Sequence, residues 1–152
     1  MKKLSLGADE RAQLRKQLKK VDFFAKPAWI DVDALASQTK LYSYDEGETI
    51  FKQGEKPDAL YLVLEGRVAV KYKKGIFKKA DVLEELGPGH FFGEMALIDG
   101  SRRTATTKTV VPTKLFVVGQ NVIDELLLEN DQFRERMRAV AETRKFLNTR
   151  RT

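Results

Sequence analysis

A short segment in the second half of the chain combines an acidic residue, two glycines and an arginine. Glu94 follows Gly93 and opens an apolar run, 95–98, that is suited to one helical turn. The start of such a turn presents free backbone N–H groups that attract anions. Arg103 adds a planar fork that suits a phosphate, and Gly93 and Gly100 let the backbone approach a ligand closely. A carboxylate would repel the phosphate itself, so Glu94 is better suited to sugar hydroxyls, and the pattern indicates a phosphorylated sugar.

Short β-prone runs separated by turn residues surround this segment. Gly54, Gly66 and Gly87 stand between the runs and are most simply turn residues. Many short strands with frequent glycine turns predict a barrel, a roll or a sandwich. The expected strands are 49–52, 59–65, 67–73, 82–86, 104–110 and 114–118.

Helical patterns occupy both ends of the chain. Residues 8–20 place Leu14 and Leu18 on one apolar stripe among arginines and lysines. A short helix is expected over 31–37, and two more over 121–128 and from 131 to 147. The sequence shows no repeat and no long linker, so one domain is expected. Its parts are a helical segment (1–40), a β-roll (41–118) and C-terminal helices (119–152).

Composition narrows the functional classes. The 152 residues are 42% hydrophobic and 33% charged, which is enough for one solvated domain with a single core. The chain has no cysteine, so disulfides and thiolate metal sites are excluded. His90 is the sole histidine, so neither a histidine metal site of the cupin kind nor a nucleophile–histidine pair is supported. We therefore expect no enzymatic activity, no metal and no cofactor.

Charge and hydropathy bear on location and partners. A net charge of +6 suits anionic partners without choosing among them. Residues 1–7 are basic but lack the apolar stretch of a signal peptide. The most apolar runs are strand-sized and too short to span a membrane. The sequence predicts a cytoplasmic protein without a membrane span.

The segment 92–106 resembles the phosphate-binding cassette of the cyclic nucleotide-binding domain family. The family pattern is roughly F-G-E-[LM]-A-L, a short loop, and R-[AT]-A-[TS]. Residues 92–97 match the first part and residues 103–106 match the second. Upstream pieces also resemble the family's first turn and next strands, so the likeness spans nearly the whole chain. These pieces are 44–50, 53–55 and 60–66.

The resemblance implies a fold and a role for each part of the site. The fold would be mainly β with flanking α-helices, an eight-stranded double-stranded β-helix (jelly-roll or cupin-like) with N-terminal helices and C-terminal lid helices. Glu94 would accept from the ribose 2′-hydroxyl, and Arg103 would pair with the cyclic phosphate. The implied ligand-binding residues are Phe92, Gly93, Glu94, Met95, Ala96, Arg102, Arg103, Thr104 and Ala105. The implied base contacts from the lid are Val140, Arg144 and Leu147.

Two residues depart from the common family pattern. Arg102 stands where many relatives carry proline. Thr104 stands where many cAMP-selective relatives carry alanine, and its hydroxyl resembles the one that meets the guanine 2-amino group in domains that accept cGMP. Some cAMP-responsive channels also carry threonine there, so the resemblance favours cAMP only slightly over cGMP.

The favoured function is a regulatory sensor that binds a cyclic nucleotide and repositions its C-terminal helix, with an output partner acting in trans. A DNA-binding regulator of the catabolite activator type is the alternative, but only 34 residues follow Val118 and they are needed for the lid helices. A scaffold that needs no ligand is a further alternative. The basic tail, 134–151, is interpreted as a solvated helix face rather than a nucleic-acid or membrane contact. The oligomeric state stays open.

Overall fold

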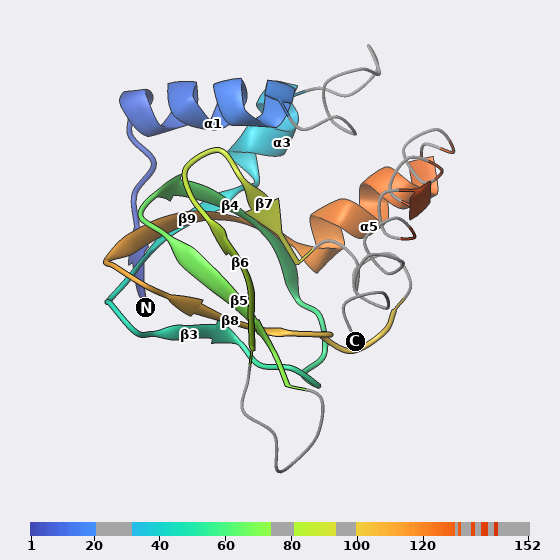
Figure 1. The fold of residues 1–152 in the computed structure, drawn as a ribbon. Helices are drawn as coiled ribbons and strands as arrows, with labels where there is room; N and C mark the ends of the chain where they lie inside the picture. The colour runs from blue at the N-terminus through green and yellow to red at the C-terminus, as the bar shows by residue number, and fades with distance from the viewer. Residues whose placement is uncertain are drawn as a thin grey trace.

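The computed structural model shows a β-roll built from two sheets, with helices packed on one of them (Figure 1). It describes residues 1–20, 32–73, 81–93, 100–129, 131, 135, 138, 139 and 142. Within these residues the chain forms nine strands and three helices.

The larger sheet has the strand order β1-β2-β9-β4-β7, and all neighbouring strands are antiparallel. Its strands are β1 (Lys2–Leu4), β2 (Lys40–Tyr44), β9 (Thr113–Gly119), β4 (Ala59–Glu65) and β7 (Phe91–Phe92). Because β9 pairs with both β2 and β4, a late segment of the chain joins two early ones into a single sheet.

The smaller sheet has the order β3-β8-β5-β6 and is also antiparallel. Its strands are β3 (Thr49–Phe51), β8 (Thr106–Thr109), β5 (Val68–Tyr72) and β6 (Asp81–Leu86). The Gln53 side chain extends this sheet: its Nε2 donates to Lys73 O at 2.9 Å, and its Oε1 accepts from Lys73 N at 3.0 Å. The Gln53 backbone N also donates to Thr106 Oγ1 at 2.9 Å. These bonds hold the turn after β3 against the end of β5 and the start of β8.

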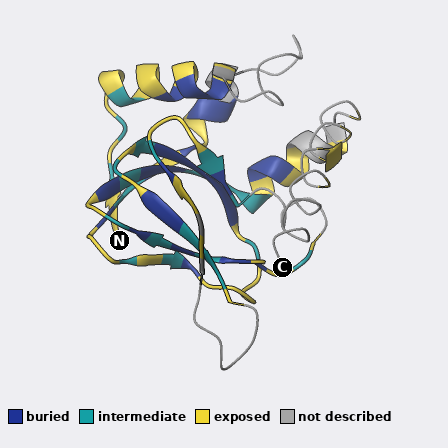
Figure 2. Ribbon diagram, in the orientation of Figure 1, coloured by how far each residue is buried: buried dark blue, intermediate teal, exposed yellow. Residues whose placement is uncertain are grey.

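Strand β4 is apolar along nearly its whole length because both of its faces are buried. Leu60 and Leu62 point into a core shared with the helices, whereas Tyr61 and Val63 point into the interior of the roll. A strand with one solvated face would alternate apolar and polar residues instead. Figure 2 shows buried residues in strands of both sheets.

The helices cover the outer face of the larger sheet. Helix α1 (Ala8–Lys20) packs on β4 and on α3 (Val32–Ser37). Leu14 and Leu18 are fully buried in the core under these helices, while the outer side of α1 is exposed (Figure 2). Helix α5 (Gln120–Glu129) follows β9 directly, and its Val122 and Ile123 enter the same core.

The expected mainly β fold with flanking helices is confirmed. The helix expected over 8–20 and the strand expected over 59–65 occur with those bounds. Strands β1, β2 and β7 were not predicted, and β1 lies within the segment expected to be helical. All three are stabilised by pairing with distant strands, which local sequence does not reveal.

Strand β8 begins at Thr106, whereas the sequence predicted a strand from residue 104. The Gln53 N–H bonds to the Thr106 hydroxyl instead of a backbone carbonyl, so the regular ladder starts only there. Most of the second C-terminal helix expected from 131 to 147 lies outside the described residues.

Candidate functional site: a buried arginine at the end of the roll

Arg103 is buried although its two neighbours in sequence are exposed. Only 3% of Arg103 is accessible, while Arg102 and Thr104 face solvent. Its backbone pairs with the turn after β3: Arg103 N donates to Glu55 O at 2.8 Å, and Gly54 N donates to Arg103 O at 2.8 Å. Extended backbone sends alternate side chains to opposite faces. The pairing therefore directs the Arg103 side chain into the roll.

The Arg103 guanidinium is held by three hydrogen bonds. Nη1 donates to Gly93 O at 2.6 Å, and Nη2 donates to Ala59 O at 2.8 Å and to Asp58 Oδ1 at 3.1 Å. A guanidinium has five N–H groups, so two are left. One of them is Nε, which is buried and has no hydrogen-bond partner among the described residues. A buried donor without a partner is costly, so this atom is suited to meet an anion.

Aromatic rings pack against the guanidinium. Arg103 Cζ lies 4.1 Å from the centroid of the Phe51 ring and 5.9 Å from that of Tyr61. The Tyr61 ring is stacked on Phe92, with centroids 5.1 Å apart and an interplanar angle of 12°. Ring faces attract cations within about 6 Å, most strongly where water is excluded. The rings therefore stabilise the buried cation from its face, while the hydrogen bonds act at its edges.

Asp58 places a negative charge next to the guanidinium. Its Oδ1 accepts from both Arg103 Nη2 and the Tyr61 hydroxyl, the latter at 3.3 Å. Burial raises the pKa of Tyr61 above its usual value, and the Asp58 carboxylate adds to this shift. The hydroxyl therefore stays protonated at neutral pH and can donate. The Asp58 side chain is 72% exposed, so solvent screens its charge much more than that of Arg103.

Gly93 brings its backbone against the guanidinium. Its φ of 86° is in the left-handed region that side chains rarely adopt. A Cβ at this position would lie 2.9 Å from Arg103 Nη1. Both the conformation and the space therefore require glycine where the carbonyl of residue 93 accepts the 2.6 Å bond.

Comparison with known proteins identifies the family. A model of the "Cyclic nucleotide-binding domain" family matches residues 41–130, more than half of the chain. The chain belongs to the cyclic nucleotide-binding domain family. The resemblance expected from the cassette is thus confirmed, and the site around Arg103 is part of a cyclic nucleotide-binding domain.

The similar proteins include regulators and kinases that are much longer than the matched segments. A cGMP-dependent protein kinase from Eimeria tenella is 30% identical over 122 residues, which are 80% of this chain and 12% of the kinase. A cyclic AMP receptor protein from Thermus thermophilus is 36% identical over 88 residues, which are 58% of this chain and 40% of the receptor. The chain therefore spans less than half the length of either relative.

A solved structure shares the fold of this cyclic nucleotide-binding domain. It is the regulatory domain of Toxoplasma gondii PKA with cAMP, which matches with a TM-score of 0.76. The match covers 89% of this chain and 51% of the other, at 21% identity. At this level of identity the similarity concerns the arrangement of the two sheets and their helices.

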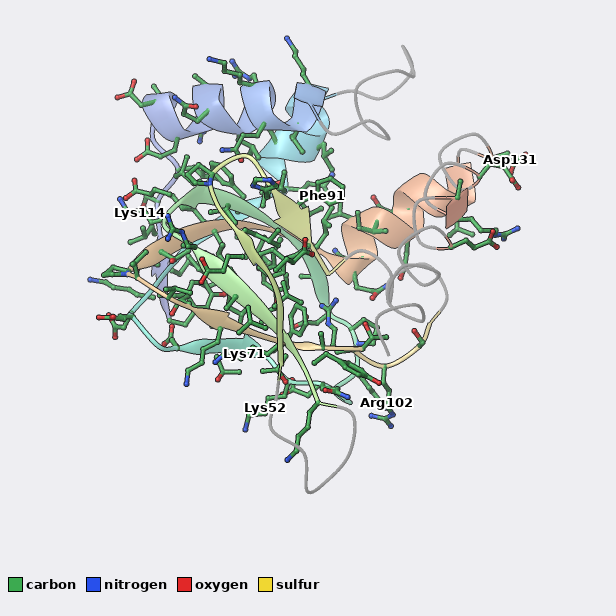
Figure 3. The ribbon with its side chains drawn as sticks, in the orientation of Figure 1. Lys52, Lys71, Phe91, Arg102, Lys114 and Asp131 are labelled. Carbon is green, nitrogen blue, oxygen red and sulfur yellow. The ribbon has the colours of Figure 1, made fainter. Side chains whose placement is uncertain are left out.

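The structure brings some of the predicted ligand-binding residues together and separates others. Gly93 and Arg103 are in direct contact. Phe92 is buried in the aromatic interior of the roll, and Ala105 is buried after Arg103. Arg102 faces outward and donates through Nη1 to Gly54 O at 3.1 Å. Figure 3 shows it at the same end of the roll as Lys52 and Lys71.

Several predicted residues lie outside the part of the chain that the structure describes. They are Glu94, Met95 and Ala96 of the cassette and Val140, Arg144 and Leu147 of the expected lid. Their roles stay predictions. Thr104, which the sequence linked to the choice of purine, is described and is exposed next to Arg103.

Three residues at the site were not singled out in the sequence. Phe51, Asp58 and Tyr61 all contact or approach the Arg103 side chain. They precede Arg103 by more than forty residues, and nothing in the local sequence links them to it. Asp58 could have been singled out in the sequence, because it is an acidic residue immediately before the buried strand β4.

The described residues contain neither a cluster of metal ligands nor a membrane-spanning helix. Across the described positions no group of three or more His, Cys, Asp or Glu side chains could hold a metal ion. His90 is exposed and lies 3.1 Å, through Nδ1, from Gly87 O. No helix in the described part of the chain is both long and apolar enough to cross a bilayer.

Proposed function

We propose that this chain binds a cyclic nucleotide and that Arg103 pairs with its cyclic phosphate. The observation that carries the proposal is a buried guanidinium with an unpartnered Nε among the described residues. A cyclic phosphate is a monoanion with two free oxygens, so it supplies both the charge and the acceptor that this group lacks. Family membership supports the class of ligand.

The remaining roles in the proposal come from the cassette pattern. Glu94 would accept hydrogen bonds from the ribose, and backbone N–H groups near Ala96 and residues 104–105 would complete the phosphate cradle. Thr104 is exposed beside Arg103. We propose cAMP as the ligand, with cGMP as the alternative.

The proposed output is a shift of the C-terminal helices. Helix α5 packs on the larger sheet through Val122 and Ile123, so it connects the roll to the residues that follow. In the proposal the segment from 131 to 147 covers the base, with Val140, Arg144 and Leu147 as contacts. Its movement would be read by a protein partner or output domain in trans, in the cytoplasm.

Titration calorimetry with cAMP and cGMP tests the proposal. Losing a charge-assisted hydrogen bond costs about 1.5–3 kcal/mol, so Arg103→Ala should weaken binding about 10- to 150-fold. Arg67→Ala is the matched control, because Arg67 is exposed and lies 3.8 Å from Glu85. That variant should bind like the wild type. Unchanged affinity in a folded Arg103→Ala protein would show that Arg103 does not bind the phosphate.

A further inference from the structure

We infer that Phe51 is a positioning residue, which aims the Arg103 guanidinium at the anion and affects binding only through that group. The inference rests on the proposed function, because it concerns how the proposed phosphate ligand is held. Phe51 is the last residue of β3 and lies far before Arg103 in the sequence.

The Phe51 ring is itself held in place. Only 7% of Phe51 is accessible. Its centroid lies 5.8 Å from that of Tyr61 and 6.0 Å from that of Phe92, with interplanar angles of 40° and 41°. These tilted contacts are a favourable arrangement for aromatic rings. The ring that faces Arg103 is therefore packed into the interior of the roll and has little freedom to turn.

The hydrogen bonds of Arg103 leave one motion that the ring can restrict. Nη1 and Nη2 are held by the carbonyls of Gly93 and Ala59 and by Asp58. These acceptors all act on the two terminal nitrogens, so the guanidinium plane can still tilt about the line that joins them. Nε lies off this line and would move with the tilt.

The face of Phe51 opposes this tilt. Arg103 Cζ lies over the ring, 4.1 Å from its centroid. The negative ring face attracts the cation, and a tilt that moves Cζ away from the ring would weaken that attraction. By fixing the plane, Phe51 fixes the direction in which the unpartnered Nε–H points. A saturated side chain would fill the space without this attraction.

Variants at Phe51 test the inference by calorimetric titration with cAMP. Phe51→Leu should weaken binding about 2- to 30-fold, the range expected for a cation–π contact of this kind. Phe51→Tyr keeps the ring face and should restore most of the affinity. If Phe51→Leu does not fold, Phe51→Met replaces it, because methionine fills irregular core space. Phe116→Leu is the matched control, because Phe116 is fully buried in the separate core beneath the helices. It should lose stability in urea but bind like the wild type.

A double-mutant cycle decides whether Phe51 acts through Arg103. Phe51→Leu should weaken binding in the wild-type background and have no further effect in Arg103→Ala, measured by NMR titration to reach weak affinities. An equal loss in both backgrounds, or no loss in either, would overturn the positioning role. The proposed function fails separately, if Arg103→Ala alone binds as tightly as the wild type. Phe51→Leu could bind with wild-type affinity while Arg103→Ala binds weakly. That result would reject the role of Phe51 and would still support the phosphate site at Arg103.

Discussion

Replacing Gly93 with alanine tests whether ligand binding depends on where the Arg103 guanidinium lies. The new Cβ would be 2.9 Å from Arg103 Nη1 and 3.4 Å from both Ala59 O and Phe51 Cε2. An arginine end at the surface would simply swing away. Here the guanidinium is buried and held by three hydrogen bonds, so the methyl group must displace it or the strand end that carries residue 93.

Gly89 supplies a matched control for the backbone strain. Its φ is 88° against 86° for Gly93, and no atom lies within 4 Å of a Cβ built there. Alanine in left-handed backbone costs about 1–2 kcal/mol. Alanine also lowers the conformational entropy of the unfolded chain, which stabilises the folded protein by about 0.4–1 kcal/mol. Gly89→Ala should therefore lower the free energy of unfolding by about 0–1.5 kcal/mol. Gly93→Ala should lose about 1–3 kcal/mol more, because the added methyl group overpacks the site.

Urea unfolding and calorimetric titration with cAMP separate stability from binding. Gly93→Ala should weaken cAMP binding about 10- to 150-fold, the cost of disrupting one charge-assisted hydrogen bond. Gly89→Ala should bind like the wild type. If the two variants bound cAMP equally well while Gly93→Ala was the less stable, the guanidinium position would matter for folding alone, and the argument for a pre-formed phosphate site would be wrong.

Two further predictions concern Tyr61 and Thr104. Burial raises the pKa of Tyr61, so its neutral hydroxyl contributes stability that is complete below about pH 10 and is lost as the pH rises towards the folded-state pKa. Urea unfolding between neutral and strongly alkaline pH should show a shallower loss of stability above pH 10 for Tyr61→Phe than for the wild type, and equal slopes would contradict the buried, protonated state. Thr104→Ala should lower cGMP affinity about 2- to 12-fold relative to cAMP, the value of one neutral hydrogen bond. An unchanged ratio of the two affinities in parallel titrations would show that the hydroxyl does not meet guanine.

Elements with a strong local pattern could be predicted from the sequence. The apolar stripe of Leu14 and Leu18 among charged residues predicts α1, and the structure buries those leucines under the helix. The continuous apolar run of 59–65 predicts β4, because a strand that is buried on both faces needs apolar residues throughout. The two-residue strand β7 carries no such pattern, and only its pairing with β4 defines it.

The sequence by itself determined the family and the residue that is proposed to meet the phosphate. Both follow from residues that are close together in the chain, because the segment from Gly93 to Arg103 can be recognised in the sequence without knowledge of the fold. The tertiary structure alone decided what surrounds Arg103. Phe51 and Asp58 reach it because the turn after β3 pairs with residue 103 and because β4 begins beside it. Strand order and register place side chains across a sheet, and both are set by the packing of the whole chain rather than by neighbouring residues.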